Sequence, residues 1–526
     1  MALIALVALG AALRSSGFTT FNPWFDDAWS MLPARVGLST AIHMVVTTPG
    51  YTLGLRSWIK LDPSSMVFAQ LPGFALALLG IVAVPLLLRS LKIREWLCLL
   101  SGLLIACSPV TVTYAMRVKE YAFDLVAACV VLALAERCRQ LPSAGRLVAL
   151  VVASVVAMWC SASTVEVAAA AAALLVVLAL VDRARRAALL AGAGVIAASA
   201  AVLWWTVLRG LPPMLSAYWR YSGFLVSTKS HHPWSYQLQA IGGGLLHGFF
   251  ALPIPFDPSG RRVVPWLVLL AAFALLGLVA LSVLPLWRSW RDRGQPVDPA
   301  FPAAVTVLIA IVAVVLGAAP LGGGRTDEVL YPALAVVLAA PVERALRHRS
   351  AARLGLIWAA VGVVAAGLVL GVGITHRATY PTFDLSGLCR RLPAPVGDTG
   401  IVVDGPASFT WAYADCSPTA IAFTNYGSVR NPTWVQGFHP VSTRAGVVIE
   451  GRLPSTAPAL HHLLARVRRL WFVSATYGAF PVGQAPSWEA LPVGSATLDA
   501  LRRLGWRSGG VTMTTTHAYA TLLVAP

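Results

Sequence analysis

Two adjacent carboxylates, Asp26 and Asp27, stand among aromatic residues near the start of the chain, in the stretch Asn22-Pro23-Trp24-Phe25-Asp26-Asp27-Ala28-Trp29. A carboxylate can take a proton from an attacking hydroxyl, and an adjacent pair can hold a divalent metal. An aspartate just before Ala28 and Trp29 is also a good helix N-cap. The pair therefore predicts either a general base or a helix start, and its own spacing leaves both readings open.

Cations stand in two later segments, each between apolar runs. Arg117 and Lys119 precede Glu120 and Tyr121, and Arg325 follows three glycines. Guanidinium and ammonium groups suit a phosphate or pyrophosphate. The alternatives are helix-end residues that extend toward the headgroups and a glycine-rich linker. We expect a phosphate site at Arg117, Lys119 and Arg325.

Composition defines the frame that must position these groups. Of the 526 residues 57% are hydrophobic and 12% are charged, whereas soluble domains carry about 25% charged residues. Long apolar runs in such a chain are typical of a polytopic α-helical membrane protein. We predict about eleven transmembrane helices. They lie at residues 1–13, 66–88, 96–115, 121–135, 147–180 (two helices), 187–208, 264–286, 303–320, 329–341 and 354–374.

Basic residues alternate with these runs. With the N-terminus in the cytoplasm, the segments after residues 88, 135, 180, 286 and 341 all fall inside, and each carries a basic cluster. Cytoplasmic loops carry such an excess of Lys and Arg. The net charge of +18 is therefore assigned to membrane topology and not to a nucleic-acid partner. Glu166 interrupts an apolar run, where a carboxylate is costly, and is expected to pair with a basic group inside the bundle.

This topology divides the chain into two predicted domains. Residues 1–375 form the membrane module, with a first exported loop at 14–65 and a second at 209–262, which contains a glycine break at 242–244. Residues 376–526 alternate short β-rich and helix-like runs, which predicts an exported α/β domain with a mainly parallel sheet. Cys389 and Cys416 stand in this region and form a disulfide if it is exported; the pairing stays open.

In the order and sidedness of these motifs the chain resembles the GT-C glycosyltransferases, most of all the protein O-mannosyltransferase and lipid A aminoarabinose transferase type. That group has an acidic pair in its first exported loop, like Asp26-Asp27, and an Arg/Glu-Tyr signature, like Arg117 to Tyr121. A late exported arginine before a Leu-Tyr-Pro-Ala-Leu helix matches Arg325 and 330–334. The His-Pro-Pro-Leu-Tyr stretch of many members is replaced by Thr47 to Leu53, which lacks the His and one Pro.

The resemblance implies an inverting glycosyltransferase that uses a polyprenyl-phosphate-linked sugar. Asp26 or Asp27 would take the proton of a glycan, lipid or protein acceptor. Arg117, Lys119 and Arg325 would bind the donor phosphate, while Glu120, Tyr121, Tyr51 and His43 would position substrate. Many members of the group need no metal, and a divalent metal at Asp26 and Asp27 stays open.

The same reading places the protein in a bacterial plasma membrane as a multi-pass protein, with a cytoplasmic N-terminus and an extracytoplasmic C-terminal domain. It also leaves alternatives. A transporter or flippase for polyprenyl-linked glycans would carry paired halves and midplane charges, and neither is evident. A ligase or polymerase acting on pyrophosphate-linked oligosaccharides would share the exported basic residues.

Overall fold

A computed structural model describes the chain at 1–18, 25–31, 38, 48–63, 65–210, 219–220, 223–226, 232–252, 263–291, 297–323, 326–347, 362–373, 385–392, 398–403, 421–422, 464–465, 467–475, 501–515 and 518–526. Residue contacts divide the molecule into two compact units. The first comprises Met1–Phe18, Thr47–Tyr51 and Gln70–Thr379, and the second comprises Thr19–Val46, Thr52–Ala69 and Tyr380–Pro526. The predicted boundary between residues 375 and 376 stays a prediction.

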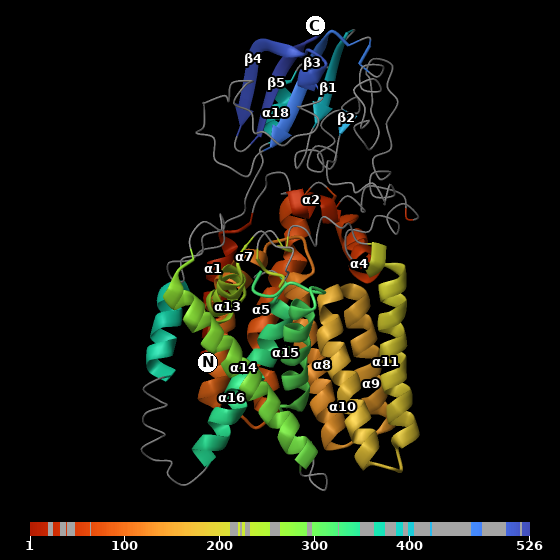
Figure 1. The fold of residues 1–526 in the computed structure, drawn as a ribbon, viewed down its shortest axis with the longest axis vertical. Coiled ribbons are helices and arrows are strands. Elements are labelled where there is room, and N and C mark those ends of the chain that lie inside the picture. Colours follow the sequence, from red (N-terminus) through yellow and green to blue (C-terminus); the bar gives the residue numbers. More distant parts are fainter. Residues whose placement is uncertain are drawn as a thin grey trace. The chain divides into compact units, whose positions relative to one another are not determined.

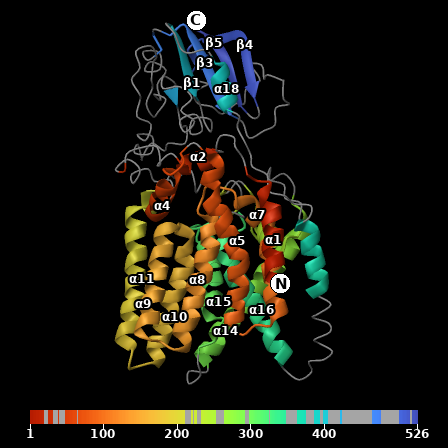
Figure 2. The same ribbon diagram turned by 180° about the vertical axis from the view of Figure 1, so that it is seen from behind.

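The first unit is a bundle of helices (Figure 1). Its helices are α1 (Ala2–Ser15), α5 (Met66–Ser90), α6 (Glu95–Cys107), α7 (Pro109–Tyr114), α8 (Tyr121–Gln140), α9 (Ala144–Cys160), α10 (Val165–Val181), α11 (Arg186–Thr206), α13 (Trp234–Phe250), α14 (Pro265–Arg291), α15 (Phe301–Val315), α16 (Tyr331–Arg347) and Gly362–Gly373. Short 3₁₀ turns, η2 (Ala162–Thr164), η3 (Leu208–Gly210) and η4 (Glu328–Leu330), join some of them. Helices α8 to α11 lie side by side in both ribbon views (Figure 2).

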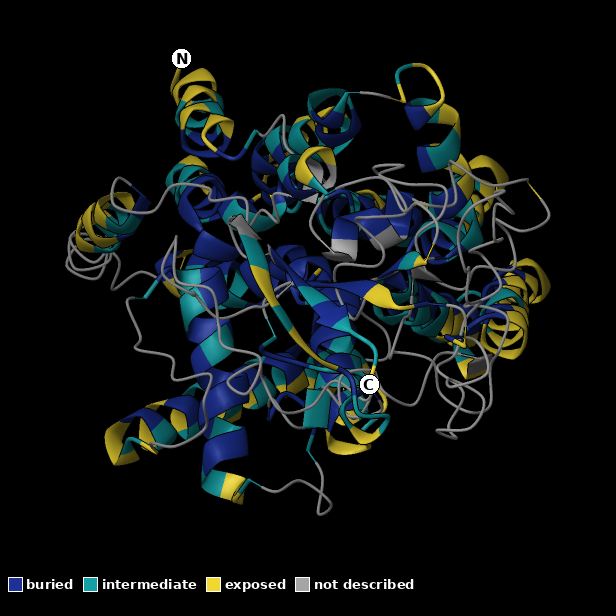
Figure 3. Ribbon diagram, turned by 90° about the horizontal axis from the view of Figure 1, so that it is seen from above, coloured by how far each residue is buried: buried dark blue, intermediate teal, exposed yellow. Residues whose placement is uncertain are grey.

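Five helices in the described part of the chain are long and apolar enough to cross a membrane: Met66–Ser90, Ala162–Val181, Arg186–Thr206, Pro265–Arg291 and Glu328–Arg347. Large apolar side chains remain exposed along the peripheral helices, where the exposed residues gather (Figure 3). An apolar helix that keeps such residues exposed has lipid as its solvent. The fold is therefore that of a polytopic helical membrane protein. The number of eleven crossings remains a prediction.

Helix α14 carries tryptophans at both ends. Trp266 is 58% exposed, and Trp287 and Trp290 are 52% and 60% exposed. At about 1.5 Å per residue, Trp266 and Trp287 lie roughly 30 Å apart along the helix, which is the thickness of a bilayer core. Tryptophan prefers the membrane–water interface. These positions place the two ends of α14 at the two interfaces.

The apolar run predicted as one helix at 96–115 is broken into α6 and α7. Pro109 lacks an amide hydrogen and disfavours helix at the residue before it, and Ser108 accepts the Thr111 amide as the N-cap of α7. Arg14 satisfies the carbonyls freed at the end of α6. Its guanidinium is fully buried and donates to the oxygens of Ala106 at 2.9 Å, Ile105 at 3.0 Å and Thr111 Oγ1 at 2.9 Å.

The glycine break predicted at 242–244 is wrong, because α13 runs through it without interruption. A Cβ on Gly242 would collide with Ala271 of α14, and one on Gly244 would collide with the carbonyl of Gly322. Gly322 itself has a φ of +83°, which favours glycine. The glycines therefore allow close packing of backbones and do not end the helix.

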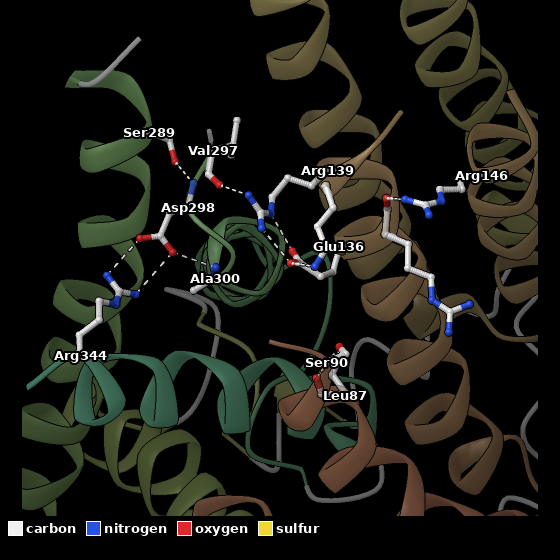
Figure 4. Close-up of polar contacts among 12 residues, drawn as sticks. Leu87, Ser90, Glu136, Arg139, Arg146, Ser289, Val297, Asp298, Ala300 and Arg344 are labelled. Atoms are coloured by element: carbon white, nitrogen blue, oxygen red, sulfur yellow. Dashed lines mark hydrogen bonds and ion pairs between the residues drawn. The ribbon is translucent and has the colours of Figure 1, made fainter. Parts of the chain in front are cut away.

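The last turns of α8, α14 and α16, with the segments 92–94 and 297–300, form one end of the bundle, here named the basic end. Arg139 donates to both oxygens of Glu136 and to the Val297 carbonyl, while Arg344 contacts Asp298 at 3.0 Å (Figure 4). Glu343 accepts the Arg94 amide at 3.0 Å and pairs with Arg347 at 2.9 Å. Ion pairs thus join segments that are distant in sequence.

The C-terminal part of the second unit contains a five-stranded sheet in the order β2-β1-β3-β5-β4. The strands are β1 (Thr399–Val403), β2 (Ile421–Ala422), β3 (Arg469–Ala475), β4 (Arg507–Thr515) and β5 (Ala518–Val524), and a short helix, α18 (Leu385–Arg391), packs on β4 and β5. β1 pairs parallel with β2 and β3, but β5 pairs antiparallel with β3 and β4. The prediction of a mainly parallel sheet is wrong: the sheet is mixed, because a terminal hairpin adds two strands that pair antiparallel.

Candidate functional site

The acidic pair lies in the first turn of a short helix, α2 (Phe25–Met31), in the second unit. The helix begins before the pair, so the aspartates are inside its first turn and do not precede it as an N-cap. The Asp27 side chain is fully buried, together with Ala28 and Met31. Carboxylates are favoured in a first turn by the helix dipole. A buried carboxylate is nevertheless costly to maintain. The burial of Asp27 therefore indicates a role beyond a favourable charge at a helix N-terminus.

The predicted phosphate-binding turn, 115–120, connects α7 to α8 in the helical unit. Gln70 of α5 donates to the Met116 carbonyl at 2.9 Å and to the Gly17 carbonyl at 3.4 Å. A Cβ on Gly73 would lie 2.6 Å from the Ala115 carbonyl, so the turn packs directly on the α5 backbone. The turn is therefore fixed by α5. The side chains of Arg117, Lys119 and Glu120 are all half-buried.

Tyr121 begins α8, and its ring packs edge-on against Tyr114 with centroids 5.3 Å apart. Tyr51 lies in α4 (Pro49–Ile59), directly after Gly50, whose Cα packs on the Trp159 carbonyl at the end of α9. Both tyrosines therefore belong to the same end of the helical unit as turn 115–120. This end, opposite the basic end along α8, is named the acidic end for the residues described next.

Asp124 lies in the first turn of α8 and is fully buried. Its Oδ2 accepts a hydrogen bond from Ser163 at 2.6 Å, and Ser163 in turn contacts Ser161 at 3.0 Å. Its Oδ1 is buried and makes no hydrogen bond with the described residues. One oxygen is thus held by η2, while the other requires a donor from outside these contacts.

Glu166 and Glu328 repeat this pattern on neighbouring elements. Glu166 is in the first turn of α10 and Glu328 opens η4, which packs on α8. Glu166 Oε2 and Glu328 Oε1 are both buried without a hydrogen bond among the described residues. Charge interactions link Glu166 with Asp124 and Asp327, and link Glu328 with Asp124. The three carboxylates therefore face one shared region.

The prediction that Glu166 pairs with a basic group is wrong for the described part of the chain, where it forms no ion pair. Arg14, the buried cation at this end, interacts with Glu328 only at longer range. Its guanidinium is already committed to the carbonyls of α6. The arginine therefore stabilises the α6–α7 break and leaves the carboxylate oxygens unpaired.

The acidic end offers hydrogen-bond acceptors beside cations. Within the described residues no group of three or more Asp, Glu, His or Cys side chains is arranged to hold a metal ion. Unpaired carboxylate oxygens accept hydrogen bonds from hydroxyl or ammonium groups, and half-buried Arg117 and Lys119 suit a phosphate. The arrangement can therefore bind a molecule that carries both hydroxyls and phosphate.

Several predicted residues lie outside the described residues: His43, Arg325 and Cys416, and the side chains of Asp26 and Cys389. The roles assigned to them stay predictions, as does the disulfide. Asp27 belongs to one unit and Arg117, Lys119, Glu120, Tyr121 and Tyr51 to the other.

Sequence reasoning missed Arg14, Asp124 and Glu328 as members of a site. One signal was available, since each is a charged residue at or near the end of an apolar run. A charge in such a position is costly in a membrane and commonly functional. Which of them lacked a partner could not be read from the sequence.

Comparison with known structures finds several similar chains, among them two structures of one protein. The chain is similar to the crystal structure of ArnT from Cupriavidus metallidurans bound to undecaprenyl phosphate, with a TM-score of 0.43, 15% sequence identity, and coverage of 99% of this chain and 97% of that one. Its apo structure gives a TM-score of 0.40 and 14% identity over 99% and 96% of the two chains. ArnT is a lipid A aminoarabinose transferase, the type that the sequence motifs resemble. No protein-family model matches the chain, and no curated protein matches its sequence.

Proposed function

We propose that the protein is an inverting glycosyltransferase that moves a sugar from a polyprenyl-phosphate donor to an acceptor hydroxyl. The carrying observation is the acidic end of the bundle. Buried carboxylate oxygens that have no hydrogen-bond partner among the described residues adjoin the turn that bears Arg117 and Lys119 there. A lipid-linked sugar phosphate presents the matching groups: a phosphate for the cations, hydroxyls for the carboxylates and an apolar tail for the surrounding lipid.

In the proposed reaction Asp26 or Asp27 takes the proton from the acceptor hydroxyl. The acceptor oxygen forms a bond to the anomeric carbon as the bond from that carbon to the phosphate oxygen breaks. The electron pair leaves with polyprenyl phosphate, whose charge is stabilised by Arg117, Lys119 and Arg325. A single in-line displacement inverts the anomeric centre.

Asp124, Glu166 and Glu328 receive a supporting role in this proposal. Their free oxygens accept hydrogen bonds from sugar hydroxyls and so orient the ring toward the acceptor. Glu120, Tyr121, Tyr51 and His43 complete the positioning set. Metal dependence is left to experiment, since Asp26 and Asp27 are themselves able to bind a divalent ion.

The proposed setting is the extracytoplasmic face of a bacterial plasma membrane, with glycan, lipid or protein as acceptor. The N-terminus would be cytoplasmic and residues 376–526 extracytoplasmic. This orientation follows the positive-inside rule, which places the basic end of the bundle in the cytoplasm.

The test is release of polyprenyl phosphate by the full-length protein in nanodiscs supplied with polyprenyl-phosphate-linked sugars. We expect Asp26→Asn or Asp27→Asn to lower the rate by on the order of 10²- to 10⁴-fold. Arg117→Gln and Lys119→Gln should raise the donor KM, as should Arg325→Gln. The matched control is Arg183→Gln, which changes an exposed basic residue just after the end of α10, the end opposite Glu166. Near wild-type rates in both aspartate variants would refute the base assignment.

A second candidate is a carrier for polyprenyl-linked glycans, because buried carboxylates inside a bundle also serve proton-coupled transport. The observation that favours it is the unpaired Glu166 within α10. The same nanodisc assay separates the two functions. Bond cleavage supports the transferase, whereas movement of intact lipid-linked sugar across a vesicle membrane without cleavage supports the carrier.

A further inference from the structure

At the basic end of the bundle a cavity of about 480 Å³ opens between α14 and α16. Its lining residues are Arg288, Asp298, Pro341, Arg344 and Ala345. Two arginines and one aspartate give the lining a net charge of +1. A cavity of this size and sign is suited to an anion.

The two arginines of the cavity are not equivalent. Arg344 is fixed by Asp298, with Nη1 to Oδ2 at 3.0 Å and Nη2 to Oδ1 at 3.4 Å. Asp298 is fixed in turn, because it accepts the Ala300 amide at 2.9 Å and donates its own amide to Ser289 Oγ at 3.0 Å (Figure 4). The Arg344 charge is therefore largely compensated and its guanidinium is held in place.

Arg288 makes no hydrogen bond and no ion pair with the described residues. It is only half-buried, and it lines the cavity directly. Other cations without such contacts at this end, Arg89 and Arg137, are exposed and fully solvated. Arg288 is thus the arginine of this cavity whose guanidinium makes no hydrogen bond with the described residues, so its donors are left for a ligand.

The position of the cavity indicates where that ligand comes from. Trp287 and Trp290 flank Arg288 on α14, remain more than half exposed, and have ring centroids 5.5 Å apart. Exposed tryptophans mark the headgroup level of a membrane. Basic pockets between membrane helices on the cytoplasmic side bind the headgroups of anionic lipids.

We propose that this cavity binds the headgroup phosphate of an anionic phospholipid through Arg288, with Arg344 as the second donor. The site lies at the opposite end of the bundle from turn 115–120, and the proposal is independent of the proposed transferase function. Burial raises the pKa of the Asp298 carboxyl, whereas the Ala300 amide and the Arg288 charge lower it.

The experiment is native mass spectrometry of the purified full-length protein in detergent, titrated with phosphatidylglycerol, phosphatidylcholine or inorganic phosphate. We expect saturable binding of phosphatidylglycerol over phosphatidylcholine, and an affinity about five- to tenfold lower in Arg288→Gln. Arg288→Lys should keep most of the affinity, and Arg137→Gln, which changes an exposed cation of the same end, should keep it within about twofold.

Three results would overturn the proposal: equal binding of the two lipids, an equal loss in Arg288→Gln and Arg137→Gln, or full competition by inorganic phosphate at equal concentration. Because Arg288 makes no hydrogen bond or ion pair with the described residues, Arg288→Gln is expected to fold. A thermal shift of the wild-type protein on adding phosphatidylglycerol gives a second readout that needs no variant, and its absence would count against the site.

Discussion

The acidic residues at the two ends of helix α8 differ in their hydrogen bonding. In the last turn, Glu136 accepts hydrogen bonds from Arg139 at 2.6 and 2.8 Å. In the first turn, Asp124 keeps one buried oxygen without a partner among the described residues. The two positions lie about 18 Å apart on one helix, so the difference reflects their surroundings and not the helix itself.

The same contrast holds for α16. Glu343, near its end, is bonded to Arg347 and to the Arg94 amide, whereas Glu328, in the turn that precedes it, keeps an unpaired buried oxygen. A buried acceptor without a partner costs about 1–3 kcal/mol. A fold that pairs Glu136 and Glu343 at one end, but leaves one oxygen each of Asp124 and Glu328 without a partner among the described residues at the other, bears that cost for a reason other than stability. We infer that the basic end holds the bundle together and the acidic end serves a ligand.

The largest effect expected from this comparison is on activity. Asp124→Asn and Glu328→Gln keep the side-chain size but remove the acceptor charge that the proposed function assigns to substrate binding. We expect the transfer rate to fall on the order of 10²-fold, with an apparent Tm equal to or above that of the wild type, since an unpaired buried charge is removed. The rate and a thermal unfolding curve of each variant, measured in the same detergent, provide the check.

The matched variant for this prediction is Glu136→Gln at the other end of α8. It should leave the rate of the folded protein near wild type and lower the Tm. If Asp124→Asn behaves like Glu136→Gln and loses stability but not activity, the inference that the acidic end serves a ligand is wrong.

Arg14 gives the next largest effect, on stability alone. Arg14→Leu removes the donors to the Ala106 and Ile105 carbonyls and to Thr111 Oγ1. The Ile105 carbonyl keeps the hydrogen bond from Thr111, but the Ala106 carbonyl loses its side-chain donor at the α6–α7 break. We expect a loss of about 2–3 kcal/mol, seen as a lower apparent Tm in detergent. Arg14→Lys, which restores one charged donor, should recover part of it. An unchanged Tm in Arg14→Leu would mean that α6 does not depend on the guanidinium.

Much of this frame could be predicted from the sequence, and the reason is physical. Apolar runs of membrane length report burial in lipid, and helices lie at the predicted positions from α1 to α16 and at Gly362–Gly373. Proline and glycine misled the prediction at two places. Pro109 ends α6, but the glycines at 242–244 allow α13 to pack closely where a break was expected.

The candidate site was only half predictable. The turn with Arg117 to Tyr121 and the acidic pair could be identified from their residue types. Pairing of acids is different, because a partner can be distant in sequence: Arg94 and Glu343 are separated by 249 positions, and Arg344 and Asp298 by 46. No local pattern shows which carboxylate will find a partner, so Glu166 was expected to be paired and Glu328 received no role.

Glu343 gives a smaller stability effect at the basic end. Glu343→Ala removes the acceptor for the Arg94 amide, which stands at the N-terminus of α6, and the ion pair with Arg347. Arg347 is well exposed, so its share of the effect is small. We expect a total loss of about 1–2 kcal/mol and no change in the rate per folded molecule. A larger fall in rate than in Tm would place Glu343 in the reaction and weaken the comparison.

The smallest effect separates the two arginines of the cavity within the basic end. Arg288→Gln should change the free energy of unfolding by less than about 0.5 kcal/mol, because Arg288 makes no hydrogen bond or ion pair with the described residues. Arg344→Gln should cost more, since it leaves the mostly buried Asp298 carboxylate without its partner. Thermal unfolding of both variants in lipid-free detergent measures the difference. If Arg288→Gln proves the more destabilising of the two, Arg288 stabilises the fold and its charge is not reserved for a ligand.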